Sequence, residues 1–168
     1  MSFLDEEFVK IARMLGGEEG VKVVKTLKEL NEASDEVIAN KSKVRINDVR
    51  KILYKLYDYA LVSCNRITGD KVGWYTFYWK LQPDQVDAFI RSRKRRALEK
   101  LKARLEYEKL HNFFVCKKCP EVRVTFEEAT ESAFRCPSCG GQLINSDNTD
   151  FKKALHEIIS KLEAELSS

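Results

Sequence analysis

The sequence predicts an α+β protein in which two small folded modules are joined by a long helix. In the first half of the chain, several amphipathic helical patterns lead into a pair of strand-like segments. A long, highly charged helical run follows, and two Cys-x-x-Cys pairs lie beyond it. These observations predict a winged-helix domain over residues 1–82, a linker helix over 83–111, a four-cysteine zinc ribbon over 112–146 and a C-terminal amphipathic helix over 147–168.

The composition narrows the classes of protein to which this chain can belong. Its 168 residues suit one domain or two small ones, and no apolar run approaches the ~20 residues of a membrane span. The first residues are acidic and lack the apolar core of a signal peptide. We therefore expect a soluble, cytoplasmic protein with no membrane partner. A net charge of +4 is too small to indicate nucleic-acid binding by itself.

Three helices are expected at the N-terminal end of the chain. Apolar residues recur at helical spacing over residues 4–15 and again over residues 18–31, and Gly16-Gly17 separates the two patterns. Ser34 is the expected N-cap of a third, short helix, since its side chain can accept a hydrogen bond from a free amide of the first turn. The residues expected to face inward are Leu4, Phe8, Ile11, Ala12, Leu15, Val21, Val24, Leu27, Leu30, Val37, Ile38 and Ala39.

The fourth helix stands where winged-helix domains place their recognition helix. Asn47 is its expected N-cap. Its buried face is expected to carry Val49, Ile52, Leu53 and Leu56. Arg50 and Lys51 face solvent and are candidate contacts, but Asp48 and Asp58 disfavour the approach of phosphate. An ordinary solvated face is the favoured interpretation, so we expect a weak reader of the major groove.

A β-hairpin, the wing, follows this helix. Residues 60–67 and 72–81 are rich in β-branched and aromatic residues, and residues 68–71 supply the turn. The alternation of side chains along the second strand should turn one set onto the helices, namely Tyr75, Phe77, Trp79 and Leu81. Trp74 and Tyr78 then lie on the outer face. These two rings either cover neighbouring side chains of the same domain or are exposed for contact with a partner molecule. Both interpretations stay open.

The linker helix begins at Pro83, which the first turn of a helix tolerates, and can continue to about His111. Between Arg91 and Arg104 there are eight basic residues and one acid. A solvated helix face is the usual explanation of such a run. The lopsided ratio also fits a surface for phosphate or for an acidic protein patch. The candidate contacts there are Arg93, Arg95 and Arg96.

The cysteine spacing predicts one structural zinc ion. The pairs Cys116/Cys119 and Cys136/Cys139 can each form a tight turn that presents two thiolates, and four such ligands complete a tetrahedral site. Four protein ligands leave no open position. A redox dithiol is the alternative for a single pair, but two pairs at ribbon spacing make it a poor fit. With no nucleophile–base pair or phosphate-binding loop either, we predict that the protein is not an enzyme.

The last helix, capped by Asn148 or Thr149, needs a neighbour because it is amphipathic. Its apolar stripe consists of Phe151, Leu155, Ile158, Ile159, Leu162 and Leu166. The apolar side of the linker helix is the nearest candidate, and a partner protein is the other.

The order of these modules resembles the archaeal transcription factor E family, the counterpart of the alpha subunit of eukaryotic general transcription factor IIE. Three stretches carry the resemblance most closely, namely residues 35–39 (DEVIA), 49–56 (VRKILYKL) and 73–79 (GWYTFYW). The four cysteines fall on the zinc ligands of the family. The helix after Asn148 is the least family-specific part of the chain.

The resemblance implies a basal transcription initiation factor that joins the preinitiation complex of a multisubunit RNA polymerase, together with the TATA-binding protein. It implies that the winged helix is held on the polymerase clamp, over promoter DNA at the upstream edge of the bubble, and that the ribbon lies towards the stalk. It further implies that the factor favours promoter opening without reading a sequence, in association with the nucleoid and in some cases with a beta subunit.

Two other functions stay open from the residues alone. A sequence-specific winged-helix regulator, with a ribbon that mediates dimerisation, would bind a defined duplex tightly without polymerase. A zinc-ribbon assembly protein would make no contact with DNA.

Overall fold

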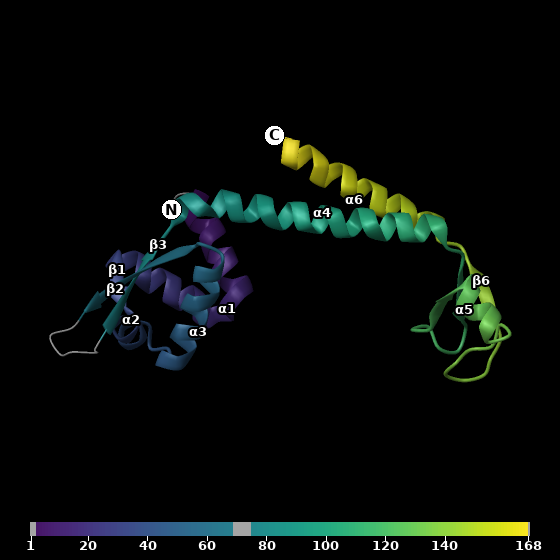
Figure 1. The fold of residues 1–168 in the computed structure, drawn as a ribbon, viewed down its shortest axis with the longest axis horizontal. Helices are drawn as coiled ribbons and strands as arrows, with labels where there is room; N and C mark the ends of the chain where they lie inside the picture. The colour runs from purple at the N-terminus through teal and green to yellow at the C-terminus, as the bar shows by residue number, and fades with distance from the viewer. Residues whose placement is uncertain (1–2, 69–74, 168) are drawn as a thin grey trace. The chain divides into compact units, whose positions relative to one another are not determined.

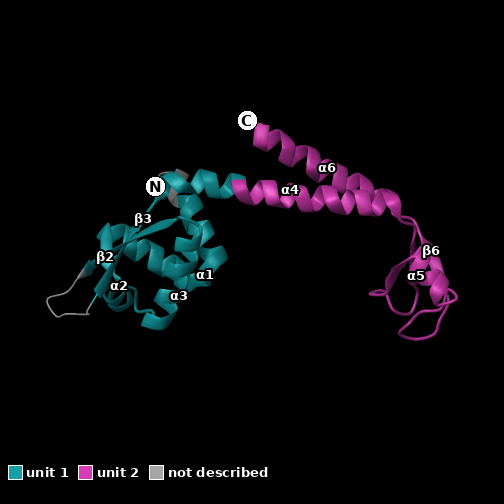
Figure 2. Cartoon of the chain, in the orientation of Figure 1, with its two compact units in different colours: residues 1–91 teal, residues 92–168 magenta. Residues whose placement is uncertain are grey.

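The computed structural model describes residues 3–68 and 75–167 (Figure 1). The chain divides into two compact units, residues 1–91 and 92–168, and each unit has its own hydrophobic core (Figure 2). The fold class is confirmed: a winged-helix domain is followed by a long helix, a four-cysteine ribbon and a C-terminal helix. The division into four segments stays a prediction. Within the described residues, no helix is both long and apolar enough to span a membrane.

The N-terminal helix α1 (Phe3–Leu30) contains a break that confirms the two expected helices. Gly17 has φ 63° and ψ −153°, a conformation that is accessible essentially only to glycine. A Cβ atom at Gly20 would overlap the backbone carbonyl oxygen of Ala12. Lys55 donates a hydrogen bond to the carbonyl oxygen of Leu15 at 3.1 Å, on the N-terminal side of the break. The glycines therefore let the chain change direction while both helical segments stay packed.

The next two helices are α2 (Asp35–Ser42) and α3 (Ile46–Asp58). Ser34 caps α2 as expected, because its side chain accepts from the amide of Val37. The expectation that Asn47 caps α3 is wrong. The cap is Arg45, whose carbonyl oxygen accepts from the amides of Asp48 and Val49 at 2.9 and 3.0 Å. The helix therefore begins at Ile46, a residue that packs against the core.

A three-stranded antiparallel sheet completes this unit, with β1 (Glu32–Ser34), β2 (Val62–Thr68) and β3 (Tyr75–Leu81) in the order β1-β3-β2. The sequence patterns did not predict β1. A short 3₁₀ helix, η1 (Pro83–Gln85), leads into α4 (Val86–Leu110), whose first turns join the core. The largest fully buried side chains of this core are Leu27, Ile38, Leu53, Leu56, Leu61, Val23, Val49 and Val86.

The expected faces of β3 are only partly correct. Trp79 is 2% exposed and Leu81 packs against the core, as predicted. Tyr75 and Phe77 share the alternation of Trp79 but are 47% and 40% exposed, so their prediction as core residues is wrong. Both residues lie in the first half of β3, at the end of the sheet that adjoins the grey segment in Figure 1. Tyr78 is half-buried opposite Ser34 of β1, and Trp74 lies outside the described residues.

The second unit contains a small antiparallel sheet of β4 (Phe113–Cys116), β5 (Arg123–Thr125) and β6 (Leu143–Ser146), in the order β5-β4-β6. The helix α5 (Phe126–Glu131) was not expected. Thr125 and Glu128 form a reciprocal capping box, which ends β5 and starts this helix. The Thr-x-x-Glu spacing was the signal that could have predicted it.

The last helix, α6 (Thr149–Ser167), packs against the part of α4 that belongs to the same unit. Of the two neighbours expected for it, the structure shows the linker helix. The contact buries Leu105, Leu155 and Ile159, and Leu98 and Leu101 pack against them. The buried residues that α6 contributes, Leu155 and Ile159, lie in its middle turns.

Candidate metal centre and interaction surfaces

Four cysteine side chains meet at one end of the β4–β6 sheet. The sulfur atoms of Cys116, Cys119, Cys136 and Cys139 all lie within 4.8 Å of one another. Cys116 ends β4, and the other three lie in the loops outside the strands. The turn of the second pair is closed by the amide of Gly140, which donates to the carbonyl of Cys136 at 2.8 Å. Gly140 has a positive φ of 68°, the left-handed conformation that this turn requires.

The thiols of this cluster are electrostatically coupled. Burial opposes the ionisation of Cys136, but the backbone amides of Cys139 and Ser138 donate towards its sulfur and, with the adjacent thiols, lower its pKa to about 7. Cys119 shows the opposite effect, since a hydrogen bond with Cys139 and burial raise its pKa to about 12. Cys136, which favours the thiolate form, thus lies next to Cys119, which resists ionisation. The reason is that four negatively charged thiolates repel one another in this small volume unless a cation is bound.

The donor set fits a zinc ion. A tetrahedral site with Zn–S bonds of ~2.3 Å requires sulfur atoms about 3.8 Å apart. The separation of Cys116 and Cys139 is 3.6 Å, and no pair of the four exceeds 4.8 Å. The apolar core of the ribbon contains only Ala129 and Leu143 as buried residues besides two of the cysteines. Such a small core leaves the stability of the module to its ligand cluster.

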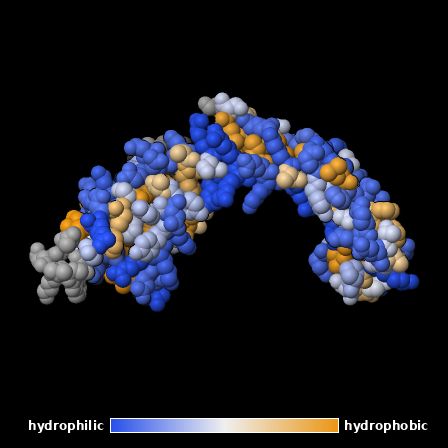
Figure 3. All heavy atoms as spheres, viewed as in Figure 1, coloured by the Kyte–Doolittle hydropathy of each residue, from blue (hydrophilic) through white to orange (hydrophobic). Residues whose placement is uncertain are grey.

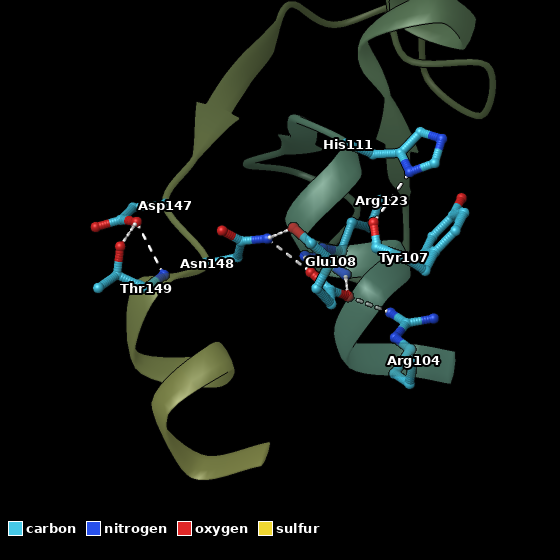
Figure 4. A network of polar contacts seen from close by, with 8 residues as sticks. All are labelled: Arg104, Tyr107, Glu108, His111, Arg123, Asp147, Asn148 and Thr149. Atoms are coloured by element: carbon cyan, nitrogen blue, oxygen red, sulfur yellow. Dashed lines mark hydrogen bonds and ion pairs between the residues drawn. The ribbon is translucent and has the colours of Figure 1, made fainter. Parts of the chain in front are cut away.

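A second polar centre, which sequence reasoning missed, surrounds Glu108 (Figure 4). Glu108 is 1% exposed, and its carboxylate accepts two hydrogen bonds of 2.7 Å from Arg123 of β5. Arg104 lies 2.6 Å from the same carboxylate. The amide of Asn148 donates both to the carboxylate and to the carbonyl of Glu108, at 2.7 and 2.9 Å. This network joins the end of α4 to the ribbon and to the start of α6.

The Glu108 network sets the ionisation of its central group. The hydrogen bonds from Arg123 are the largest cause that lowers the pKa of Glu108 to about 2, and the bond from Asn148 and the charge of Arg104 add to them against burial. No local pattern could have predicted the role of Glu108, because it is one of many charged residues on α4. What distinguishes it is its hydrogen bonding to two partners that are distant in sequence. The guanidinium of Arg123 also lies 3.6 Å from the ring centre of Phe113.

The exposed cations of α3 are engaged within the domain. Arg50 forms an ion pair with Asp35 at the start of α2, which raises the pKa of Arg50 through that hydrogen bond and charge. Lys51 lies 3.5 Å from Asp48, and Asp48 also pairs with Arg45 at 3.2 Å. The two candidate contacts on this helix therefore lie beside carboxylates.

An aromatic groove, rather than a basic face, lies beside α3. It has a volume of about 330 Å³ and is lined by Asp35, Glu36, Arg50, Tyr54, Tyr75, Thr76, Phe77 and Trp79. The ring of Tyr54 stands edge-on to Trp79, with 5.6 Å between their centres. Tyr75 is covered on one face by the guanidinium of Arg66, 3.3 Å from the ring centre. The misassigned side chains of β3, Tyr75 and Phe77, thus form one wall of this groove.

The basic run of α4 is divided between paired and exposed side chains. Lys94 and Lys102 form ion pairs with Glu165 and Glu163 of α6, at 2.8 and 2.6 Å. Of the predicted contacts, Arg95 and Arg96 are exposed and Arg93 is half-buried. The charge pattern along α4 could not predict these pairs, because their acidic partners lie far away in the sequence, on α6.

Comparison with known proteins adds family information. The family model described as "TFIIE alpha subunit" matches residues 7–110. The chain is 42% identical to "Transcription factor E" of Thermococcus kodakarensis, over 96% of this chain and 88% of that protein. It is 41% identical to "Transcription factor E" of Metallosphaera sedula, over 98% and 93% respectively. A solved structure titled a possible transcriptional regulator from Methanosarcina mazei has a TM-score of 0.44 at 17% identity, over 58% of this chain and 86% of that one.

Proposed function

The chain belongs to the TFIIE alpha and transcription factor E family of transcription initiation factors, and from this premise we propose that it binds RNA polymerase in the preinitiation complex and stabilises promoter opening without reading DNA sequence. The winged helix would dock on the polymerase clamp, near promoter DNA at the upstream edge of the bubble. The ribbon would hold one structural zinc ion and lie towards the stalk. The TATA-binding protein, and a beta subunit where one exists, would be further partners on the nucleoid.

The observation that carries this proposal is the charge pairing on α3. A helix that reads bases needs free Arg, Lys, Asn or Gln side chains at the groove and cations for the phosphates. Here Arg50 and Lys51 are paired with Asp35 and Asp48. Exposed ion pairs are individually weak, so a DNA phosphate could take the place of each carboxylate as the partner of the cation. The two displaced carboxylates would still lie beside the DNA backbone and repel it. This arrangement supports a domain that docks on protein.

The aromatic groove supports protein docking directly. Aromatic side chains are enriched where protein interfaces are most stable, because they bury a large area with few rotatable bonds. Tyr54, Tyr75 and Phe77 are half-exposed around the buried ring of Trp79. We assign the polymerase contact to this groove. If the wing contacts separated DNA strands, we assign that contact to Tyr75 and Phe77 in preference to the half-buried Tyr78. Trp74 stays a candidate for the same contact.

The test is the double substitution Tyr54→Ala with Phe77→Ala. We expect at least tenfold weaker retention by purified RNA polymerase, since two interface anchors commonly contribute more than ~1 kcal/mol each. Promoter melting, followed by permanganate reactivity of thymines, should fall in parallel at limiting factor. The matched control is Met14→Ala with Ile67→Ala, two exposed apolar side chains outside the groove.

Retention equal to that of the parent protein would refute the docking role of the groove. Normal retention with reduced melting, relieved on a template mismatched at the start site, would assign the aromatics to strand capture. Tight binding of one selected duplex by the factor alone would favour the sequence-specific regulator.

A further inference from the structure

Helix α6 covers one side of the basic run of α4 with carboxylates. Glu165 and Glu163 pair with Lys94 and Lys102, whose positions differ by eight residues and are therefore about 80° apart on one side of α4. Arg95 lies at the edge of this side, about 20° from Lys102 at 100° per residue, and is exposed. We call Lys94 and Lys102 the covered face. Arg96 and Lys100 lie on other sides of the helix, about 120–160° from these two lysines at 100° per residue.

The covering acids are poorly placed for α6 itself. Glu165 lies in the last turn, which contains no basic residue within the described chain. A carboxylate there opposes the helix dipole, whose C-terminal end is negative. Beyond Ile159, no described residue of α6 is fully buried. The C-terminal turns therefore depend on two exposed ion pairs and half-buried side chains, whereas the middle turns are anchored by Leu155 and Ile159 in the apolar contact. Figure 3 shows hydrophobic side chains still reaching the surface over this helix.

We propose that the C-terminal turns of α6 compete with nucleic acid for the covered face, and that this face binds the phosphate backbone of duplex DNA when Glu163 and Glu165 are displaced. Two features favour phosphate over an acidic protein. The run is rich in arginine, whose planar guanidinium matches phosphate with two parallel hydrogen bonds. Each of the two carboxylates also places a single negative charge beside a lysine. The phosphates of a DNA backbone, which recur at regular intervals, can replace these charges. This inference does not require the proposed docking on polymerase.

The rest of the basic run adds exposed cations around α4. Within residues 92–167, no carboxylate forms an ion pair with Arg95, Arg96 or Lys100. These side chains are exposed and can attract a polyanion before α6 moves. Displacement of the C-terminal turns then adds Lys94 and Lys102 to the contact. The chain would thus have two states, one that binds DNA weakly and one that binds it more tightly. The tighter state has two more cations in contact with DNA.

The test is Glu163→Gln with Glu165→Gln in the full-length zinc-loaded protein. Binding of a labelled 30-base-pair duplex of arbitrary sequence is measured by anisotropy from low to moderate salt. We expect affinity to rise about tenfold at low salt, and the slope of log K against log [salt] to steepen by about 1.8, since each phosphate contact contributes about 0.9. Circular dichroism should show that α6 is retained.

Two controls separate this effect from a change in net charge. Glu131→Gln with Glu157→Gln removes the same charge from exposed positions that form no ion pair in the described structure, and it should raise affinity far less. Adding Lys94→Gln and Lys102→Gln to the test variant should abolish the gain. An equal gain in the control pair, or a gain that survives the lysine substitutions, would overturn the proposal. A gain for polyglutamate without a gain for DNA would overturn it in favour of an acidic protein partner.

Discussion

Glu108 shows how one buried charge organises a junction. A carboxylate near the C-terminal end of α4 is unfavourable for the helix dipole, and its burial adds a desolvation cost. Both costs are offset by the paired hydrogen bonds from Arg123, the charge of Arg104 and the amide of Asn148. The side chains that satisfy it come from α4, β5 and the loop before α6. Loss of this one charge should therefore loosen all three elements.

We expect Glu108→Gln to destabilise the second unit by on the order of 3 kcal/mol, because two guanidinium groups lose their buried partner. Thermal or urea unfolding of the zinc-loaded protein, followed by signals from residues 92–168, measures the change. Glu106→Gln is the control, since within the described residues Glu106 forms an exposed pair with Lys109 and no other ion pair. A Glu108→Gln variant as stable as the Glu106→Gln variant would contradict the central role of Glu108.

The same residue makes stability depend on pH. The folded-state pKa of Glu108 is about 2, below the ordinary value of 4.5, so its contribution is fully present above about pH 5 and is lost as pH falls towards 2. The difference in stability between the parent and Glu108→Gln should therefore shrink over this window. The difference is the quantity to measure, since proton competition for the cysteine ligands affects both proteins alike. A difference that stays constant from pH 6 to pH 2.5 would contradict the assignment.

Gly20 illustrates a constraint of shape rather than charge. A Cβ atom there overlaps the carbonyl of Ala12 across the break in α1, so Gly20→Ala must shift the backbone. We expect a loss of about 1–3 kcal/mol in the unfolding free energy of the first unit, typical of overpacking. Glu19→Ala, at the exposed neighbouring position, should change stability little. Equal stability of the two variants would show that the backbone at the break in α1 can shift to accommodate the added Cβ atom without a loss of unfolding free energy.

At the scale of elements, the ribbon and α5 differ in what maintains them. The helix α5 has its own capping box and one fully buried side chain, Ala129. The sheet around it has few buried side chains besides the cysteines. We infer that the strands of the ribbon depend on its ligand cluster, whereas the winged helix has a large apolar core that does not.

Cys136→Ser tests this division. The purified parent should contain one zinc ion by elemental analysis, and the variant should lose it, with collapse of the amide signals of residues 112–146 and retention of those of the first unit. Cys64→Ser is the matched control, since Cys64 is half-buried in β2 and lies outside the cluster. A metal-free parent, or a ribbon that remains folded in Cys136→Ser, would contradict a structural zinc site.

At the scale of the whole molecule, charge is distributed unevenly among the surfaces. The helix α3 keeps its cations in pairs, whereas α4 presents arginines without a carboxylate partner in the described chain. The long helix, rather than the recognition helix, is then the main basic surface. The contacts that we propose for this surface with promoter DNA or polymerase should weaken as salt screens them.

Reversal of Arg95 and Arg96 to Glu should reduce recruitment to a polymerase–promoter complex, and most strongly at low salt. Arg93 is left intact because it is half-buried. The control Lys22→Glu with Lys25→Glu makes the same change of net charge on exposed positions of α1. Recruitment that is equal for the two double variants at every salt concentration would return Arg95 and Arg96 to an ordinary solvated surface.

Local patterns were sufficient for the features that depend on nearby residues. The spacing of Val49, Ile52 and Leu53 placed the buried face of α3 correctly, because helix periodicity is a property of the chain itself. Ser34 was a correct cap for the same reason. The two Cys-x-x-Cys pairs identified the thiol cluster, because each tight turn brings its own two sulfur atoms together. The order of modules and the family follow from such local signals.

Only the tertiary structure decided which side chains are covered. Alternation along β3 assigned Tyr75 and Trp79 to one face, but the helices bury only Trp79 of the two, so one strand face is both core and surface. The pairing of Lys102 with Glu163, and of Glu108 with Arg123, joins residues far apart in the chain. Coulomb and hydrogen-bond energies depend on distances in space, which sequence spacing does not contain beyond a few residues. The sequence therefore determined the modules, and the fold determined which of their charges and aromatic rings are free to act.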